Sequence, residues 1–322
     1  MKTYIVAFDD INAINNFKHV PCRFIKDDIE VVIHLNPIAE ISASEYILNY
    51  DLLISSHHFT ETAKICSNGI PYPENNRVFL QRYSKIEQAV GLKQIAKKLS
   101  LSNFYTLDIW VTANDSNWAF NNAPTKCFII KCNDGARGIG QILVKDNIPL
   151  SELLNAINDC EMTTEKLLQQ FPSIIYNTEG ENYANEGLNM LRQQGFHAVE
   201  YIPNIVSEYR FTIINNNLCY PVKRFVKTTS DYKQVTGAPA VRDSTISEFG
   251  NVNELKPFME EINAVISQLN IKFGSCDIFV MDDGRWGLFE FCNQFGTSAY
   301  DPEDMIEIHQ DFIISQIKKL CK

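Results

Sequence analysis

A lysine that leads into a glycine-rich loop is the feature that most constrains this chain. Lys131 opens the sequence KCNDGARGIG, whose glycines are Gly135, Gly138 and Gly140. Glycines let backbone N–H groups approach phosphate oxygens without side-chain obstruction, and a nearby lysine adds a compact cation. A plain turn whose glycines only supply positive φ explains the loop equally well on its own. The loop is therefore a candidate phosphate-binding element that needs support from the rest of the chain.

The two common glycine fingerprints of nucleotide-binding proteins do not fit this loop. The order G-x-x-x-x-G-K-[ST] is absent from the sequence. The loop also leads into an apolar run at 141–145 that is typical of a strand, so it lacks the helix N-terminus of a dinucleotide-binding turn. A strand–loop–strand arrangement requires a different nucleotide-binding fold.

Three units are expected along the 322 residues. Residues 1–80 alternate short apolar runs with helix-compatible stretches, which predicts a small α/β unit with a parallel sheet. Residues 81–203 contain the glycine loop, helical sequence at 151–170 and a mixed apolar run that ends at a proline. Residues 204–322 form the third unit.

The third unit contains the clearest strand and helix patterns. A hairpin is expected from 209–214 and 218–226, because the asparagines between these runs tolerate the left-handed conformation of tight turns. The apolar spacing of 255–269 predicts a helix with one buried face. Two more strands, 276–281 and 286–291, are joined by a turn that contains Asp-Asp-Gly.

Two carboxylates on the last pair of strands suggest a metal site. Asp277 and Glu290 interrupt otherwise apolar strands, and the turn between the strands brings them opposite each other. Two carboxylates that close repel each other unless a cation lies between them. Asn293 follows three residues after Glu290 and adds an amide oxygen, a ligand type that divalent ions accept. A surface hairpin with solvated acids is the alternative.

Composition narrows the function classes and the compartment. The formal net charge of −10 argues against a general nucleic-acid-binding surface. No apolar run approaches the roughly 18 residues that a membrane span needs. The nine cysteines include no C-x-x-C pair, so we interpret them as free thiols of a cytoplasmic protein.

Four motifs, in this order and at these spacings, resemble the ATP-grasp superfamily. They are the glycine loop, VEYI at 199–202, EYRFTI at 208–213, and DIFV followed by LFEFCNQFG within 277–296. The resemblance covers about residues 80–310. It implies an α/β N-terminal unit followed by an α+β two-lobed ATP-grasp fold that clamps ATP between its lobes.

The resemblance also assigns roles to individual residues. Asp277, Glu290 and Asn293 would hold Mg²⁺, with Mn²⁺ as an alternative. The family usually has Glu-x-Asn, whereas this chain has one residue more between Glu290 and Asn293. In a regular strand the two side chains then point to opposite faces, so either a bulge re-aims Asn293 or it is not a ligand. The residues that would contact ATP are Lys85, Lys131, Gly135, Arg137, Gly138, Gly140, the hinge Glu200, Tyr201 and Ile202, and the ribose-binding Glu208.

A cluster of cations on the central hairpin provides the catalytic candidates. These are Arg210, Lys223, Arg224 and Lys227, and strand alternation puts Lys223 and Lys227 on one face and Arg224 on the other. Cations there would neutralise charge on the γ-phosphate and on an acyl phosphate. Arg242, in the loop that follows, would reach the substrate when that loop closes. A basic surface strand is the alternative.

The first functional hypothesis, which follows from the resemblance, is an ATP-dependent carboxylate–amine ligase that forms an acyl phosphate and releases ADP and phosphate. Its partners would be a small-molecule or peptide carboxylate and an amine nucleophile, and a homodimer is compatible with the sequence. An ATP-grasp phosphotransferase or nucleic-acid-end ligase is the second hypothesis, against which the acidity counts. A non-catalytic ATP-binding module is the third, although Lys131, Asp277 and Glu290 are all present.

Overall fold

In the part of the chain that the structure describes, the computed structural model has three sheets of five or six strands and one two-stranded sheet. The residues that the structure describes are 1–8, 11–35, 50–55, 77–79, 84–111, 127–133, 140–144, 148, 150–176, 181–202, 204–224, 228–229, 232–233, 247–292, 300 and 302–321.

The first sheet lies at the N-terminus and has the strand order β2-β3-β1-β4-β5. Its central strand β1 pairs in parallel with β3 and β4, β4 pairs in parallel with β5, and β2 runs antiparallel at the edge. The elements are β1 (Lys2–Phe8), α1 (Ile11–Phe17), β2 (Arg23–Lys26), β3 (Ile29–His34), β4 (Leu52–Ser55) and β5 (Arg77–Phe79). The predicted parallel α/β unit is confirmed.

The second sheet is antiparallel, with the order β10-β9-β8-β11-β7. Its strands are β7 (Ile109–Val111), β8 (Phe128–Cys132), β9 (Ile142–Val144), β10 (Ile174–Tyr176) and β11 (Phe196–Glu200). Helices α4 (Leu150–Asn158), α5 (Thr164–Gln170) and α6 (Glu181–Gln194) share one apolar core with β8–β11. The helical sequence expected at 151–170 is therefore two helices, because a turn at Asp159 ends α4 and the Thr163 side chain caps the start of α5.

The third sheet has six strands in the order β16-β13-β12-β17-β18-β6 and is antiparallel apart from β6. Its strands are β6 (Phe104–Tyr105), β12 (Ile205–Ile214), β13 (Asn217–Arg224), β16 (Ser247–Phe249), β17 (Phe273–Met281) and β18 (Trp286–Cys292), and the two-stranded sheet is β14 (Thr228–Thr229) with β15 (Tyr232–Lys233). Both predicted hairpins are present. Asn215 and Asn216 have φ of 51° and 63°, and Gly284 has φ of 81°, as their turns require.

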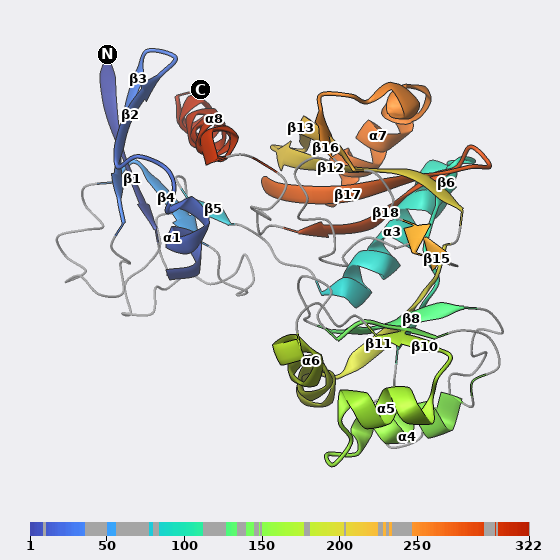
Figure 1. Cartoon of the computed structure of the whole chain (residues 1–322). Coiled ribbons are helices and arrows are strands. Elements are labelled where there is room, and N and C mark those ends of the chain that lie inside the picture. The colour runs from blue at the N-terminus through green and yellow to red at the C-terminus, as the bar shows by residue number, and fades with distance from the viewer. Residues whose placement is uncertain are drawn as a thin grey trace.

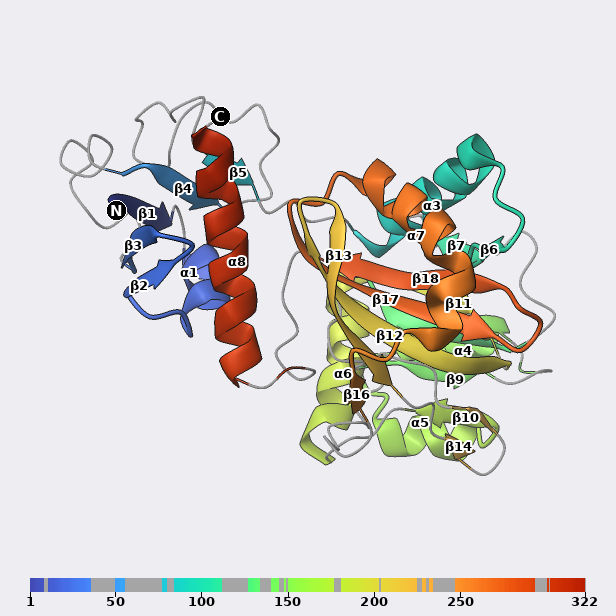
Figure 2. The same cartoon turned by 90° about the horizontal axis from the view of Figure 1, so that it is seen from above.

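The second and third sheets are stacked, with α4–α6 on the outer side of the second sheet and a further helix, α7 (Met259–Leu269), on the outer side of the third (Figures 1 and 2). Helix α7 packs with Tyr209, Phe211 and Ile213 of β12 in the core of the third sheet. A 3₁₀ segment, η3 (Asn253–Phe258), precedes α7 and contains Pro257. Since proline cannot donate the α-helical backbone bond, the helix predicted at 255–269 is regular only from Met259. Helix α3 (Lys85–Leu99) contacts α7, β18 and β7, and so joins the two sheets.

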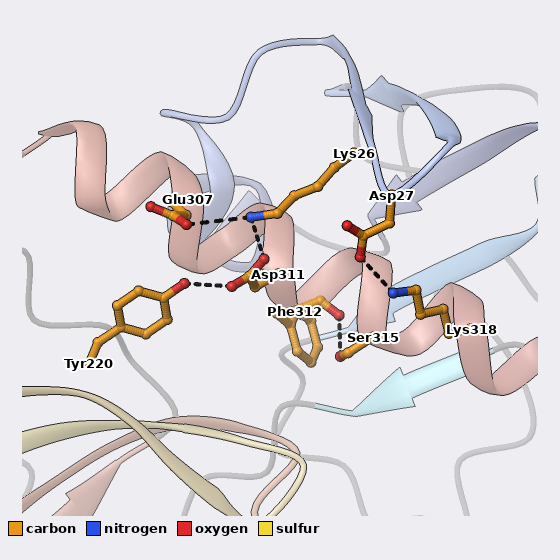
Figure 3. Close-up of polar contacts among 8 residues, drawn as sticks. All are labelled: Lys26, Asp27, Tyr220, Glu307, Asp311, Phe312, Ser315 and Lys318. Atoms are coloured by element: carbon orange, nitrogen blue, oxygen red, sulfur yellow. Dashed lines mark hydrogen bonds and ion pairs between the residues drawn. The ribbon is translucent and has the colours of Figure 1, made fainter.

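The C-terminal helix α8 (Pro302–Leu320) returns to the N-terminal sheet (Figure 2). Its buried residues, including Ile308 and Phe312, share one apolar core with β1, β3, β4 and α1. Figure 3 shows the polar contacts at this interface: Lys26 pairs with Asp311, and Asp311 also accepts a 2.5 Å hydrogen bond from Tyr220 of β13. Helix α8 thus connects the first and third sheets. No helix within the described ranges has the length and hydropathy of a membrane-spanning segment.

Candidate functional site

Asp277 of β17 and Glu290 of β18 lie directly opposite each other, as the turn between the strands predicts. The register shifts immediately afterwards, because Ile278 pairs with Leu288 and Phe289 is the extra residue of a bulge. Asp277 is buried, with 4% of its surface exposed, and Glu290 is partly exposed. The third sheet therefore brings two carboxylates together on one face.

Cations balance both carboxylates within the protein. Arg210 of β12 donates two hydrogen bonds to Asp277, from Nε to Oδ1 and from Nη2 to Oδ2, each 2.7 Å long. This two-pronged geometry is the strongest form of an arginine–carboxylate pair. Lys85 donates from Nζ to Glu290 Oε2. The repulsion expected between the carboxylates is thus offset by Lys85, which the sequence analysis assigned to ATP, and by Arg210, which it assigned to catalysis.

The position of Lys85 follows from the start of α3. Ser84 caps this helix: its Oγ accepts from the Glu87 N–H at 3.2 Å, while its own N–H donates to Glu87 Oε2 at 2.8 Å. One turn further on, Gln88 Oε1 accepts from the backbone N–H of Phe291 at 3.0 Å. This contact fixes the first turn of α3 against β18. Lys85 is consequently held beside Glu290.

Lys131 reaches the same site from the second sheet. Burial of its amine is the largest influence on its pKa and lowers it, and Lys85 lowers it further. The carboxylates of Glu290, Glu208 and Asp277 act in the opposite direction. Because these charges act on one ammonium group, side chains of both sheets converge on it.

The face of β12 that carries Arg210 also carries Glu208, which is 3% exposed. Arg224 of β13 is the backbone partner of Glu208, so it belongs to this face, although its side chain lies outside the described residues. Lys223 lies on the opposite face. It pairs with Tyr209, and its Nζ donates to Glu254 Oε1 at 2.6 Å. The structure does not bring Lys223 together with Asp277 and Glu290.

The hinge residues lie between the two sheets. The Glu200 carboxylate accepts from Tyr105 Oη at 2.6 Å and from the Asp108 N–H at 3.4 Å, so its side chain is held toward 105–108. Tyr201 and Ile202 are both buried. Ile202 belongs to an apolar cluster against which Phe289 packs. The backbone N–H groups of Glu200 and Tyr201 donate to the carbonyls of Asp108 and Cys127, at 3.0 and 3.4 Å, so the predicted hinge is held by its backbone as well as by its side chains.

Part of the predicted site falls outside the description. Gly135, Arg137, Gly138, Lys227, Arg242 and Asn293 lie outside the described residues. Gly140, at the end of the loop, is described and has φ of 73°. A Cβ added there would come within 2.8 Å of the Gly187 carbonyl oxygen of α6. This position therefore requires glycine for both its conformation and its packing.

Solved structures with the same architecture cover the chain from end to end. A D-alanine–D-alanine ligase from Bacillus anthracis superimposes with a TM-score of 0.54 at 12% identity, covering 99% of each chain. The same enzyme complexed with ATP gives a TM-score of 0.53 at 13% identity, covering 98% of each chain. This chain has the ATP-grasp fold. No family model matches the sequence, and no curated protein matches it either.

The sequence analysis missed His197, a buried polar residue beside Lys131 in this candidate site. His197 of β11 is the direct partner of Lys131 of β8, is 1% exposed, and has its Nδ1 3.0 Å from Asn133 Oδ1. Burial lowers the pKa of His197 to about 3, and Lys131 and Lys85 contribute to the shift. The signal in the sequence was a histidine within an otherwise apolar strand.

The carboxylates suit a magnesium ion that is shared with a nucleotide. Mg²⁺ is usually held by one or two carboxylates together with phosphate oxygens and water. Asp277 and Glu290 supply two such groups on a rigid hairpin. Within the described part of the chain, no group of three or more histidine, cysteine or acidic side chains is placed to hold a metal. The pair therefore fits a metal that phosphates help to bind.

Proposed function

We propose that this chain is an ATP-dependent carboxylate–amine ligase. The observation that carries the proposal is that Lys131 of the second sheet interacts electrostatically with Asp277 and Glu290 of the third sheet and with Lys85 of helix α3, which pairs with Glu290. The ATP-grasp fold supports the proposal that the chain binds ATP. The two solved structures reported above are named as D-alanine–D-alanine ligases. At this low identity the likeness supports the fold alone, so the activity is argued from the site.

In this proposal each group has a distinct task. Lys131 and Lys85 bind phosphate oxygens of ATP. Glu208 accepts hydrogen bonds from the ribose, and the hinge backbone at 200–202 meets the adenine edge. Asp277 and Glu290 hold Mg²⁺, which, when bound, neutralises phosphate charge. Arg210 donates to both carboxylate oxygens of Asp277 and so fixes the orientation of this proposed ligand.

The reaction requires positioning and charge neutralisation rather than a protein nucleophile. A substrate carboxylate oxygen attacks the γ-phosphorus, and the bond between that phosphorus and the β,γ-bridging oxygen breaks to release ADP. The amine nitrogen then attacks the acyl carbon, loses a proton, and displaces inorganic phosphate. Arg210 and Arg224 belong to the strand face that would meet the charge that develops.

The decisive experiment is turnover of ATP by the full-length protein with Mg²⁺ and a pool of amino acids and short peptides. The proposal expects ADP and phosphate in equal amounts, together with a new amide detected by mass spectrometry. A phosphorylated product would instead indicate a phosphotransferase. Tight ATP binding without ADP formation on any carboxylate of the pool would indicate a non-catalytic module.

A further inference from the structure

The face of the second sheet that carries Lys131 also carries two residues without a role in the proposed chemistry, His197 and Asn133. His197 is the cross-strand partner of Lys131, and Asn133 follows Lys131 by two residues, so all three side chains belong to one face. The opposite face, with Cys132, Phe196 and their neighbours, packs against α4–α6 (Figure 1). The three residues therefore face the third sheet.

The hydrogen bonds of Asn133 determine which ring nitrogen of His197 carries the proton. Asn133 Nδ2 donates to the Gln194 carbonyl at 3.3 Å, which leaves its Oδ1 as the acceptor for His197. His197 must then carry its proton on Nδ1 and leave Nε2 as an acceptor. Burial and the nearby lysines lower the pKa of His197 to about 3, so the imidazole stays neutral at physiological pH. A neutral ring adds no second positive charge beside Lys131.

The backbone and side chain of Asn133 are both held by contacts with residues at the start of β11. Its backbone N–H donates to the Gly195 carbonyl at 3.1 Å, which extends the β8–β11 ladder by one pair. Gly195 has φ of 72°, and a Cβ added there would lie 3.0 Å from Asn133 Nδ2. A side chain at position 195 would thus displace the amide. The end of β8, where the glycine loop begins, is held by three bonds to residues 194–197.

We propose that His197 is a positioning residue for nucleotide binding. Through its hydrogen bond to Asn133 it fixes the end of β8, so that Lys131 presents its ammonium group to the phosphates. The inference rests on the proposed ATP binding. If the end of β8 were held loosely at Asn133, Lys131 would be placed less accurately, and a misplacement of about 1 Å is enough to weaken binding and catalysis strongly.

The test is the affinity for Mg·ATP, measured by calorimetry on the full-length protein. His197→Leu removes the hydrogen bond and keeps the volume, and we expect affinity to fall about tenfold, as for the loss of one net hydrogen bond. His197→Asn keeps a donor close to the position of Nδ1, and we expect affinity within about twofold of the original protein. Asn133→Ala, at a partly exposed position, removes the same bond together with the bond to the Gln194 carbonyl. It should weaken affinity at least as much as His197→Leu, so it serves where His197→Leu does not fold.

A matched control separates positioning from general stability. His309 is also buried, has its pKa lowered to about 4, and packs between Phe17 and Phe273 near the N-terminal sheet. His309→Leu should change thermal stability without changing ATP affinity.

The affinity ratio between the original protein and His197→Leu should also stay constant from about pH 6 to 8, because a neutral imidazole does not titrate there.

Three results would overturn the inference while leaving the proposed function intact. The first is folded His197→Leu and Asn133→Ala proteins that bind Mg·ATP as the original does. The second is a His197→Asn protein that binds as weakly as His197→Leu. The third is an affinity ratio between the original protein and His197→Leu that changes with pH as a histidine titrates. If the unaltered protein itself does not bind Mg·ATP, the proposed function fails, and this inference fails with it.

Discussion

The two sheets that face each other across the candidate site differ in whether their charged side chains are paired within the protein. On the third sheet, Asp277 and Glu290 are each paired with a cation of the protein, Arg210 and Lys85. On the second sheet, burial lowers the pKa of Lys131, and its neighbour across the strand is a neutral histidine. Asp277 and Glu290 of the third sheet thus form ion pairs within the protein. The ammonium group of Lys131 has lost part of its hydration, which disfavours its charged form.

This difference indicates which ligand the site suits. An anion beside Lys131 would restore the solvation that its amine has lost. A divalent cation at Asp277 and Glu290 would compete with Lys85 and release it toward the same anion. A magnesium–nucleotide complex brings both charges at once, which neither an anion nor a metal ion alone can do.

The largest effect is expected when the pairing on the third sheet is broken. In Asp277→Ala the guanidinium of Arg210 loses the carboxylate that accepts two of its hydrogen bonds, while the Arg210 side chain is only 11% exposed. Loss of one member of a buried pair typically costs about 3–5 kcal/mol, because the remaining charge stays buried. We expect a drop of that order in the free energy of unfolding, measured by urea denaturation, together with loss of metal-dependent ATP binding.

The exposed pair between Arg285 and Asp283 is the matched control. Its side chains are 41% and 39% exposed, so Asp283→Ala should cost no more than about 1 kcal/mol. An Asp277→Ala protein as stable as Asp283→Ala would show that the third sheet does not hold a buried, mutually dependent pair. The contrast between the two sheets would then lose its basis.

Lys131→Met tests the second sheet. The variant should bind ATP at least about tenfold more weakly, since a hydrogen bond to a charged group contributes about 1.5–3 kcal/mol. Its stability at neutral pH should be equal to or higher than that of the original protein, because a desolvated charge is removed. A variant that keeps full ATP affinity would remove Lys131 from the site.

The lowered pKa of Lys131 also predicts the direction in which the stability of the protein changes with pH. The pKa of Lys131 is lowered in the fold from its ordinary value of 10.5, so between the two values the unfolded chain binds more protons. Stability then rises with pH through that window, and the destabilisation by this group is complete below it. Urea midpoints between about pH 7 and 10.5 should rise less in Lys131→Met than in the original protein.

The sequence predicted the third sheet well because local turn chemistry sets its register. Asn215 and Asn216 adopt positive φ at one turn and Gly284 at the other, and these turns fix which residues face each other. The opposition of Asp277 and Glu290 follows from the second turn. Strand alternation also predicts which cations of the hairpin share a face of the sheet, once the cross-strand partner of one of them is known.

Contacts between distant segments could not be predicted in this way. Lys85 meets Glu290 across 205 positions, because the capped start of α3 packs on β18. Helix α8 buries its apolar face on the N-terminal sheet, although its own spacing shows only that it has such a face. Glu254 binds Lys223 through a 3₁₀ turn that the sequence did not signal. Such pairings depend on tertiary packing, which periodicity does not encode.

Gly140→Ala tests how tightly the far end of the glycine loop is held on the second sheet. Alanine at φ of 73° costs about 1–2 kcal/mol, and the added Cβ would press on the Gly187 carbonyl. Gly250→Ala is the control for conformation alone, because φ there is 78° and a Cβ meets nothing within 4 Å. The stability lost by Gly140→Ala beyond that of Gly250→Ala, measured by urea denaturation, reports the contact with α6. Equal losses would mean that the contact relaxes freely.

Lys223→Met should have the smallest effect and sharpens the comparison within the third sheet itself. Lys223 lies on the face covered by α7 and donates to Glu254, so it is directed away from Asp277. We expect ATP affinity within about twofold of the original protein. The loss of stability should stay below about 1 kcal/mol, because the Glu254 side chain that loses Lys223 is 43% exposed and water can solvate it. An affinity loss as large as that of Lys131→Met would place the phosphates on the opposite face of the hairpin. Arg210 and Asp277 would then form a purely structural pair, and the two sheets would not share a ligand.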